Sequence, residues 1–172
     1  MAGLLRNTHR DGEKAVGQYL ELLRENGCKV FHDIIGNDFN IDHVIICKNG
    51  IFTIETKTYS KPVKGEAKIQ YDGENVKING RDILKDVLTQ SKAEAYWLKT
   101  HLKEMTGKES KVKPVVVFPG WYIENSAAGY NPDVWVVNPK ALGNFLPKSG
   151  MVLTDDEINL FSYHLSRYIR ST

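Results

Sequence analysis

The dipeptide Asn49-Gly50 constrains the fold of this chain more than any other feature of its sequence. Two runs rich in Val, Ile, Phe and Thr flank the dipeptide. Asn and Gly tolerate the positive φ angles that a two-residue hairpin turn requires. The chain from Ile41 to Thr58 is therefore expected to form two antiparallel strands that reverse at this dipeptide.

Side-chain alternation gives this hairpin one charged face and one apolar face. With Asn49 and Gly50 at the centre of the turn, Asp42 lies opposite Lys57 and diagonal to Glu55. The β-carbons of a diagonal pair are roughly 7 Å or a little less apart, a gap that two carboxylates can close around one divalent cation. The apolar face is expected to carry Ile41, Ile45, Phe52 and Ile54.

The size and composition favour one globular domain. The chain has 172 residues, of which 41% are hydrophobic and 26% are charged. A net charge of +2 is too small for the surface as a whole to attract nucleic acid. Cys28 and Cys47 fall in apolar runs, where buried free thiols are expected. No apolar run reaches the roughly 18 residues of a membrane span, and the first residues lack the apolar region of a signal peptide, so a cytoplasmic protein is expected.

The rest of the chain is expected to alternate between strands and helices. The expected helices run from about Thr8 to Asn26, Asp82 to Met105, Pro139 to Phe145 and Asp155 to Arg170, and the expected strands outside the hairpin are Cys28 to Ile35, Lys64 to Tyr71, Asn75 to Ile78, Val112 to Phe118 and Val134 to Val137. The segment from Pro119 to Pro132 is expected to be a loop. Thr154 and Glu157 form a capping-box pattern at the start of the last helix.

These elements predict an α/β fold with a mixed central sheet flanked by helices. The strand from Val112 follows a long helix, so it should return parallel to the hairpin through a right-handed crossover. We expect a single domain over residues 1–172, with a core at about 12–138 and C-terminal helices from 139–170 packed on it.

Two helical positions add candidates for a site. Glu13 extends by one turn the apolar stripe of Val16, Leu20 and Leu23. It either interacts with the helix dipole or marks where the stripe borders a site. Gln90 lies beside Glu94 on the flank of the apolar stripe of the helix expected from Asp82 to Met105. At this position a polar side chain can face a cleft.

The charged face of the hairpin has two interpretations. Hard carboxylate oxygens can hold Mg²⁺ or Mn²⁺, and a compact lysine cation can stabilise charge on a phosphate. Alternatively, Asp42 and Lys57 form an ordinary cross-strand ion pair worth ~0.2–1 kcal/mol. That pair would leave Glu55 and Glu13 without a role. His43 points to the other strand face, so we expect it to be packed or hydrogen-bonded rather than catalytic.

The order of helix, three antiparallel strands, helix and strand, with Asp42 followed by Glu55-Thr56-Lys57, resembles the core of the PD-(D/E)XK nuclease superfamily. Within that superfamily the chain is similar to the nuclease-related domain (NERD) family over roughly Gly12 to Leu102. The segments that carry the likeness are Gly12-Glu13, Ile41-Asp42-His43, and Gly50-Ile51-Phe52 through Glu55-Thr56-Lys57-Thr58-Tyr59. Ile41 replaces the Pro of the superfamily name, and Glu94 stands where some relatives have Tyr.

The resemblance implies a restriction-endonuclease-like αβββαβ core that hydrolyses phosphodiester bonds of DNA, or of RNA. It implies Asp42 and Glu55 as ligands of Mg²⁺ or Mn²⁺, Lys57 beside the scissile phosphate, and Glu13 and Gln90 as auxiliary residues. The expected partner is nucleic acid, and no protein partner can be inferred from the sequence. The alternative is a non-catalytic module that keeps the nuclease fold and binds nucleic acid or protein.

Overall fold

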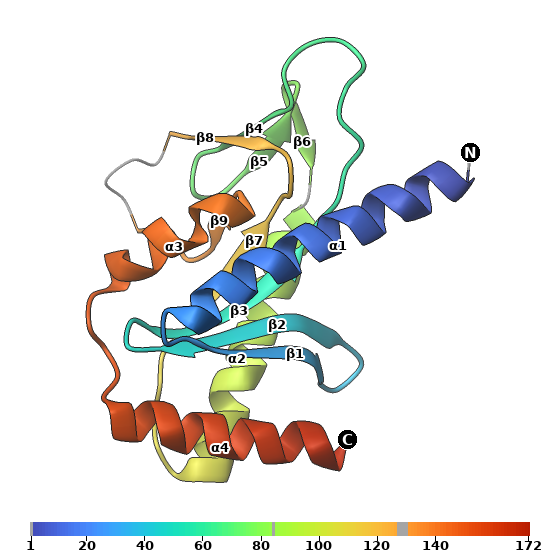
Figure 1. Cartoon of the computed structure of the whole chain (residues 1–172). Coiled ribbons are helices and arrows are strands. Elements are labelled where there is room, and N and C mark those ends of the chain that lie inside the picture. Colours follow the sequence, from blue (N-terminus) through green and yellow to red (C-terminus); the bar gives the residue numbers. More distant parts are fainter. Residues whose placement is uncertain (1, 84, 127–130) are drawn as a thin grey trace.

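The computed structural model describes residues 2–83, 85–126 and 131–172, and the side chains of all of these except 2–10, 83 and 85. Its centre is a mixed sheet in the order β1-β2-β3-β7-β9 (Figure 1). These strands are β1 Lys29–Ile35, β2 Asn40–Cys47, β3 Gly50–Thr56, β7 Val112–Val117 and β9 Trp135–Val137. The first three pair antiparallel, and β7 and β9 run parallel to β3. The predicted α/β class, mixed sheet and parallel return are confirmed.

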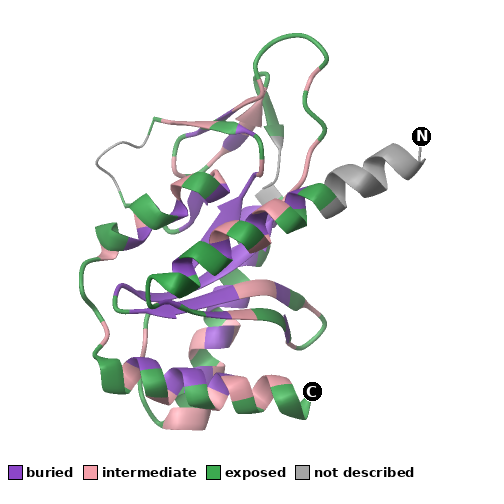
Figure 2. Ribbon diagram, viewed as in Figure 1, coloured by how far each residue is buried: buried purple, intermediate pink, exposed green. Residues whose placement is uncertain are grey.

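Helices cover both faces of this sheet. The helix α1 (Ala2–Glu25) packs on one face together with α3 (Leu142–Phe145), and it starts six residues before the predicted Thr8. The helices α2 (Lys85–Thr106) and α4 (Asp155–Ser171) pack on the other face. The short helices η1 (Pro139–Ala141) and η2 (Leu146–Ser149) flank α3. In Figure 2 the strands are mostly buried between helices whose outer faces are exposed.

The packing face and the end of α1 follow from its sequence. Val16, Leu20 and Leu23 recur every three or four residues and are buried against the sheet. Gly27, with φ of 91°, ends the helix. The N–H of Gly27 donates to the carbonyl of Arg24, and the N–H of Cys28 donates to that of Leu23, both at 3.1 Å. This is a Schellman cap, which satisfies carbonyls that the helix leaves open.

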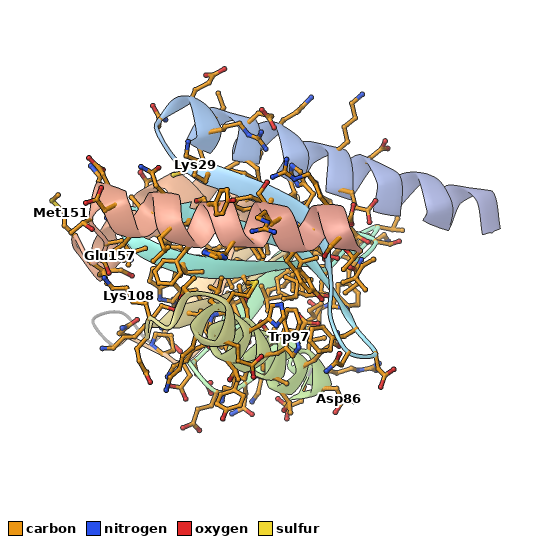
Figure 3. The ribbon with its side chains drawn as sticks, turned by 90° about the horizontal axis from the view of Figure 1, so that it is seen from below. Lys29, Asp86, Trp97, Lys108, Met151 and Glu157 are labelled. Atoms are coloured by element: carbon orange, nitrogen blue, oxygen red, sulfur yellow. The ribbon has the colours of Figure 1, made fainter. Side chains whose placement is uncertain are left out.

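The last helix is anchored at its start. The predicted capping box is confirmed: the N–H of Glu157 donates to the hydroxyl of Thr154, and the N–H of Thr154 donates to the carboxylate of Glu157. Figure 3 shows Lys108, just after α2, beside Glu157, and their side chains form an ion pair at 3.3 Å. None of the helices within the described residues has a stretch long and apolar enough to cross a membrane.

A second sheet, in the order β6-β5-β4-β8, was only partly predicted. Its strands are β4 Lys68–Tyr71, β5 Val76–Ile78, β6 Arg81–Ile83 and β8 Tyr122–Asn125. The hairpin of β4 and β5 is confirmed, whereas β8 lies in the segment predicted as a loop and pairs parallel to β4. Asp82 belongs to β6 rather than to the long helix, so α2 starts three residues later than predicted.

The hairpin of β2 and β3 forms with a different register from the predicted one. Cys47 pairs with Gly50, so Lys48 and Asn49 are the central turn residues. The prediction that placed Asp42 opposite Lys57 is therefore wrong by two residues. A shift of two keeps every side chain on its predicted strand face. Continued to the open end, the observed register brings Asp42 opposite Glu55 instead of diagonal to it.

One predicted position on the apolar face is also wrong. Ile45, Phe52 and Ile54 pack under α1 as expected, but Ile41 packs with the core under α2 and α4. Ile34 of β1, which pairs with Ile41, packs in the same core, and Asp33 directly before it has φ of 52°. The expectation of buried free thiols at Cys28 and Cys47 is confirmed.

Candidate functional site

The open end of the β2–β3 hairpin brings together three of the predicted site residues. The N–H of Thr56 donates to Oδ2 of Asp42 at 2.9 Å, which ties Asp42 to the adjacent strand. Nζ of Lys57 lies 3.2 Å from Oε1 of Glu55. The ion pair thus joins Lys57 to Glu55 on its own strand, and the cross-strand pair of Asp42 with Lys57 is not present among the described residues.

Glu55 is a buried carboxylate with one oxygen left open. Only 8% of the residue is exposed. Its Oε2 is buried and has no hydrogen-bond partner among the described residues. Burial raises the pKa of Glu55 to about 7, the charges of Asp42 and Glu94 add to the increase, and Lys57 opposes it. At neutral pH without a cation this carboxyl is therefore poised between its two protonation states.

Asp42 has the same electrostatic character in a weaker form. Burial raises its pKa, and the N–H of Thr56 and the ammonium of Lys57 act against that increase. The charges of Glu13 and Asp33 add to the rise. Two facing carboxyls whose pKa values are both raised are a place where a cation is electrostatically favoured.

Lys57 follows directly after β3 and reaches toward solvent. Its backbone N–H donates to the carbonyl of Val117 at 3.0 Å, so the residue is held at the end of β7 as well. Its side chain is 29% exposed. The ammonium can therefore contact Glu55 and still meet an anion that arrives from outside.

Sequence reasoning missed Glu94 as a site residue. Glu94 lies on α2 and only 2% of it is exposed. Burial raises its pKa and the charge of Asp42 adds to the rise, whereas the hydrogen bond from Gln90 lowers it. Nε2 of Gln90 donates to Oε1 of Glu94 at 2.9 Å. Gln90 itself is exposed, and the contact that connects it to the site runs through Glu94.

Glu13 stands at the edge of the site. It is exposed on α1, and its charge acts on Asp42. The preceding residue, Gly12, is buried, and a β-carbon there would lie 2.3 Å from Cγ2 of Thr58. Because a glycine is needed for this close approach, α1 can bring Glu13 next to the segment that follows Lys57.

His43 takes no part in this cluster. Its Nδ1 forms a hydrogen bond with Nδ1 of His32 at 2.7 Å. Burial, together with the charge of His32, lowers the pKa of His43 to about 4. The expectation that His43 is hydrogen-bonded is confirmed.

The donor set consists of carboxylate oxygens, which suit hard cations such as Mg²⁺, Mn²⁺ and Ca²⁺. Asp42 and Glu55 offer oxygen ligands, and Oε2 of Glu55 has no hydrogen-bond partner among the described residues. Mg²⁺ is commonly held by one or two carboxylates together with waters and substrate phosphates. Within the described part of the chain, no group of three or more His, Cys, Asp or Glu side chains is arranged to hold a metal. A zinc site, which needs three or four protein ligands, does not fit.

Comparison with known proteins adds a family match to this geometry. A family model described as "Nuclease-related domain" matches residues 8–119. The solved structure of SfsA from Pyrococcus furiosus in complex with Ca²⁺ is similar over 77% of this chain and 55% of that chain, with 17% sequence identity and a TM-score of 0.33. The chain thus spans about half the length of that protein, and the likeness is too distant to define a common site. No curated protein matches the sequence.

Proposed function

The chain belongs to the nuclease-related domain family, and from this membership we propose that it is a nuclease that uses Mg²⁺ or Mn²⁺ to hydrolyse phosphodiester bonds, in DNA rather than RNA. One observation carries the proposal. Glu55 is buried with one oxygen on Lys57 and the other without a partner, and the strand register brings it opposite Asp42. An ordinary surface ion pair would have no reason to bury such a carboxylate.

In this proposal Asp42 and Glu55 hold the cation. When bound, the ion neutralises charge on the phosphate and lowers the pKa of a coordinated water. The N–H of Thr56 fixes the orientation of Asp42, so that this carboxylate is positioned before the ion arrives. The ion pair with Lys57 likewise fixes the orientation of Glu55. The partly exposed ammonium of Lys57 remains accessible to an incoming phosphate.

Lys57 is the residue that meets the substrate. Its ammonium stabilises the negative charge that grows on the phosphate oxygens, and it can orient the attacking water. Glu94 keeps negative charge beside Glu55, and Gln90 holds Glu94 in place. Glu13 adds its charge to the edge of the site beside Asp42.

A cleavage assay with site variants tests this function. The wild type with Mg²⁺ or Mn²⁺ should cut at least one DNA substrate among single-stranded, duplex, nicked and branched forms, and EDTA should stop the reaction. Asp42→Asn and Glu55→Gln should abolish cleavage and also remove Mn²⁺ binding in calorimetry, because each replaces an anionic oxygen that the ion requires. A contaminating nuclease would be indifferent to either substitution.

The same assay separates a nuclease from a binding module. DNA that is retained but never cut by a wild type shown to bind Mn²⁺ would favour a non-catalytic module with the nuclease fold. Unchanged Mn²⁺ binding in both variants would rule out this metal site.

A further inference from the structure

A cavity of about 450 Å³ lies beside the ends of β7 and β9. Its walls come from the turn and strand at 120–125, the end of β9, the helices η1 and α3, and Lys61 from the segment between β3 and β4. In Figure 1 β9 lies beside α3, and β8 lies above them. The volume falls in the range of about 300–1,000 Å³ that is usual for small-molecule sites.

Hydrogen bonds hold these walls in place. Nδ2 of Asn138 donates to the carbonyl of Trp121 at 2.7 Å, and its Oδ1 accepts from the N–H of Lys140 at 3.0 Å. Nε1 of Trp121 donates to the carbonyl of Tyr59 at 3.2 Å. The cavity is therefore formed in advance of any ligand, which reduces the entropy cost of binding.

The lining combines aromatic rings with lysines. Trp121, Tyr122 and Phe145 line the cavity, and Tyr122 is 68% exposed. Lys61 and Lys140 also line it, and neither ammonium has an ion-pair partner among the described residues. Tyr122 is the exposed ring, whereas Trp121 is only 2% exposed and Nζ of Lys148 lies 3.9 Å from the ring centroid of Phe145. An exposed ring on which a flat apolar group can stack, next to unpaired cations, suits a nucleobase and its phosphates better than a peptide or a lipid chain.

Backbone hydrogen bonds connect this cavity to the candidate metal site. The N–H of Lys57 donates to the carbonyl of Val117, and the N–H of Phe118 donates to that of Val137. Two strand spacings, roughly 10 Å, thus separate β3 from β9. Ligands of sheets with parallel strands commonly bind beyond the carboxyl ends of those strands, which is where both places lie.

We propose that this cavity binds an unpaired nucleobase of the DNA strand whose phosphate lies at Lys57, while Lys61 and Lys140 contact neighbouring phosphates. The proposal rests on the proposed nuclease function. A base in a continuous duplex is stacked and paired and cannot enter the cavity, so the preferred substrate carries unpaired nucleotides.

A binding experiment without cleavage tests the cavity. The protein with Asp42→Asn is titrated in metal-free buffer with duplex DNA that contains a short unpaired stretch, either with bases or with abasic sites at the same positions. The base-bearing DNA should bind about tenfold more tightly, since stacking of a base on aromatic side chains has roughly this effect. Equal affinities would overturn the proposal.

Two variants in the Asp42→Asn background assign the effect to the cavity. Ala141→Phe should fill the cavity, and Tyr122→Ala removes an exposed ring whose loss the fold tolerates. Each should reduce the preference for base-bearing DNA to about threefold or less. If Ala141→Phe does not fold, Tyr122→Ala decides alone, and an unchanged preference would place the base elsewhere and overturn the proposal.

Lysine variants test the phosphate contacts. Lys61→Ala and Lys140→Ala should each weaken binding of both DNA forms several-fold and reduce its salt dependence. Lys29→Ala and Lys111→Ala, at exposed lysines that do not line the cavity, are the matched controls. Equal effects in all four variants would overturn the assignment of the rim lysines.

The outcome is separable from the proposed nuclease function. A base preference in a wild type that cuts no DNA would leave the cavity proposal standing and reject the nuclease. Cleavage by the wild type without any base preference would do the reverse.

Discussion

The two ends of the β2–β3 hairpin differ in whether their buried polar groups have hydrogen-bond partners. At the turn end, buried Asn49 donates through Nδ2 to the carbonyl of Gly150 at 2.7 Å. The carbonyl of Lys48 accepts from the N–H groups of Val152 and Leu153. At the open end, Oε2 of Glu55 and the hydroxyls of Thr53 and Thr56 are buried without a partner among the described residues.

This difference concerns the stability of the fold: the contacts at the turn end stabilise it, whereas the unpartnered polar groups at the open end destabilise it. Buried polar groups without partners cost free energy, typically about 1–3 kcal/mol each. At the turn end, the hydrogen bond from Asn49 to Gly150 avoids this cost, whereas at the open end the unpartnered groups still carry it. The metal site that we propose would explain why such a cost persists at Glu55.

The largest expected effect compares a lysine from each end. Lys57→Ala should reduce turnover by ~10²-fold or more while Mn²⁺ binding persists, because it removes a preorganised charge from the phosphate. Lys48→Ala, at an exposed lysine of the turn on the same hairpin, should leave turnover unchanged. Rates at saturating DNA, together with calorimetry, measure both. Equal rates for the two variants would remove the functional distinction between the ends.

The second prediction concerns the pH dependence of stability without metal. The pKa of Glu55 is raised from its ordinary 4.5 to about 7, so the folded protein holds this proton more tightly than the unfolded chain does. The stability from this proton is complete below about pH 4.5 and is lost as the pH passes about 7, a change of up to about 3 kcal/mol.

Glu55→Gln tests this linkage because glutamine does not titrate. In EDTA the variant should be more stable than the wild type at pH 8, and the difference should disappear toward pH 4.5. Urea unfolding across this pH range measures it. A variant that is less stable than the wild type at pH 8 would show that the charged Glu55 supports the fold rather than a ligand.

The third prediction tests the turn end. Asn49→Ala should lower the free energy of unfolding by about 1–3 kcal/mol, because the carbonyl of Gly150 loses its donor. The loss should be the same from pH 5 to pH 8, unlike the Glu55→Gln difference, and turnover should remain. Urea unfolding at both pH values checks it. A loss of turnover without a loss of stability would contradict the division between the two ends.

The same comparison explains how far the sequence could go. Periodicity was enough to predict the hairpin, the central sheet and the strand faces except that of Ile41. It could not predict the register, because Asn49 lies in the turn in both the predicted and the observed register, and the contacts of Lys48 and Asn49 with residues 150–153 come from far along the chain. The strands β6 and β8 were missed because they are only three and four residues long and are defined by their pairing with the second sheet.

At the site, residue types were predicted more readily than contacts. Asp42, Glu55 and Lys57 were chosen correctly as neighbours, but their pairing depended on the register. Glu94 had a readable signal, since it lies three residues after Ser91 and four before Leu98, both buried, and a carboxylate on such a stripe needs a reason. Gln90, one turn earlier on α2, was the predicted residue, and in the structure it is the hydrogen-bond donor to Glu94.

The smallest expected effect on turnover is that of Gln90→Ala, which tests whether Gln90 acts through Glu94. Gln90→Ala removes the amide that donates to Oε1 of Glu94, a bond that lowers the pKa of Glu94. Turnover should fall by about fivefold at most, as expected for one partly exposed hydrogen bond. Gln70→Ala, at an exposed glutamine on β4, is the control and should have no effect.

Glu94→Gln should act more strongly and in a defined direction. The charge of Glu94 raises the pKa of Glu55, so its removal should move the pH midpoint of the Glu55 linkage below about 7. Gln90→Ala makes Glu94 easier to protonate, so it should move the midpoint the same way by a smaller amount. The difference in unfolding free energy between each variant and its Glu55→Gln double variant, followed against pH, measures the midpoint. If Gln90→Ala instead lowered turnover as much as Lys57→Ala with no change in the midpoint, Gln90 would contact the substrate directly, and its connection through Glu94 would be secondary.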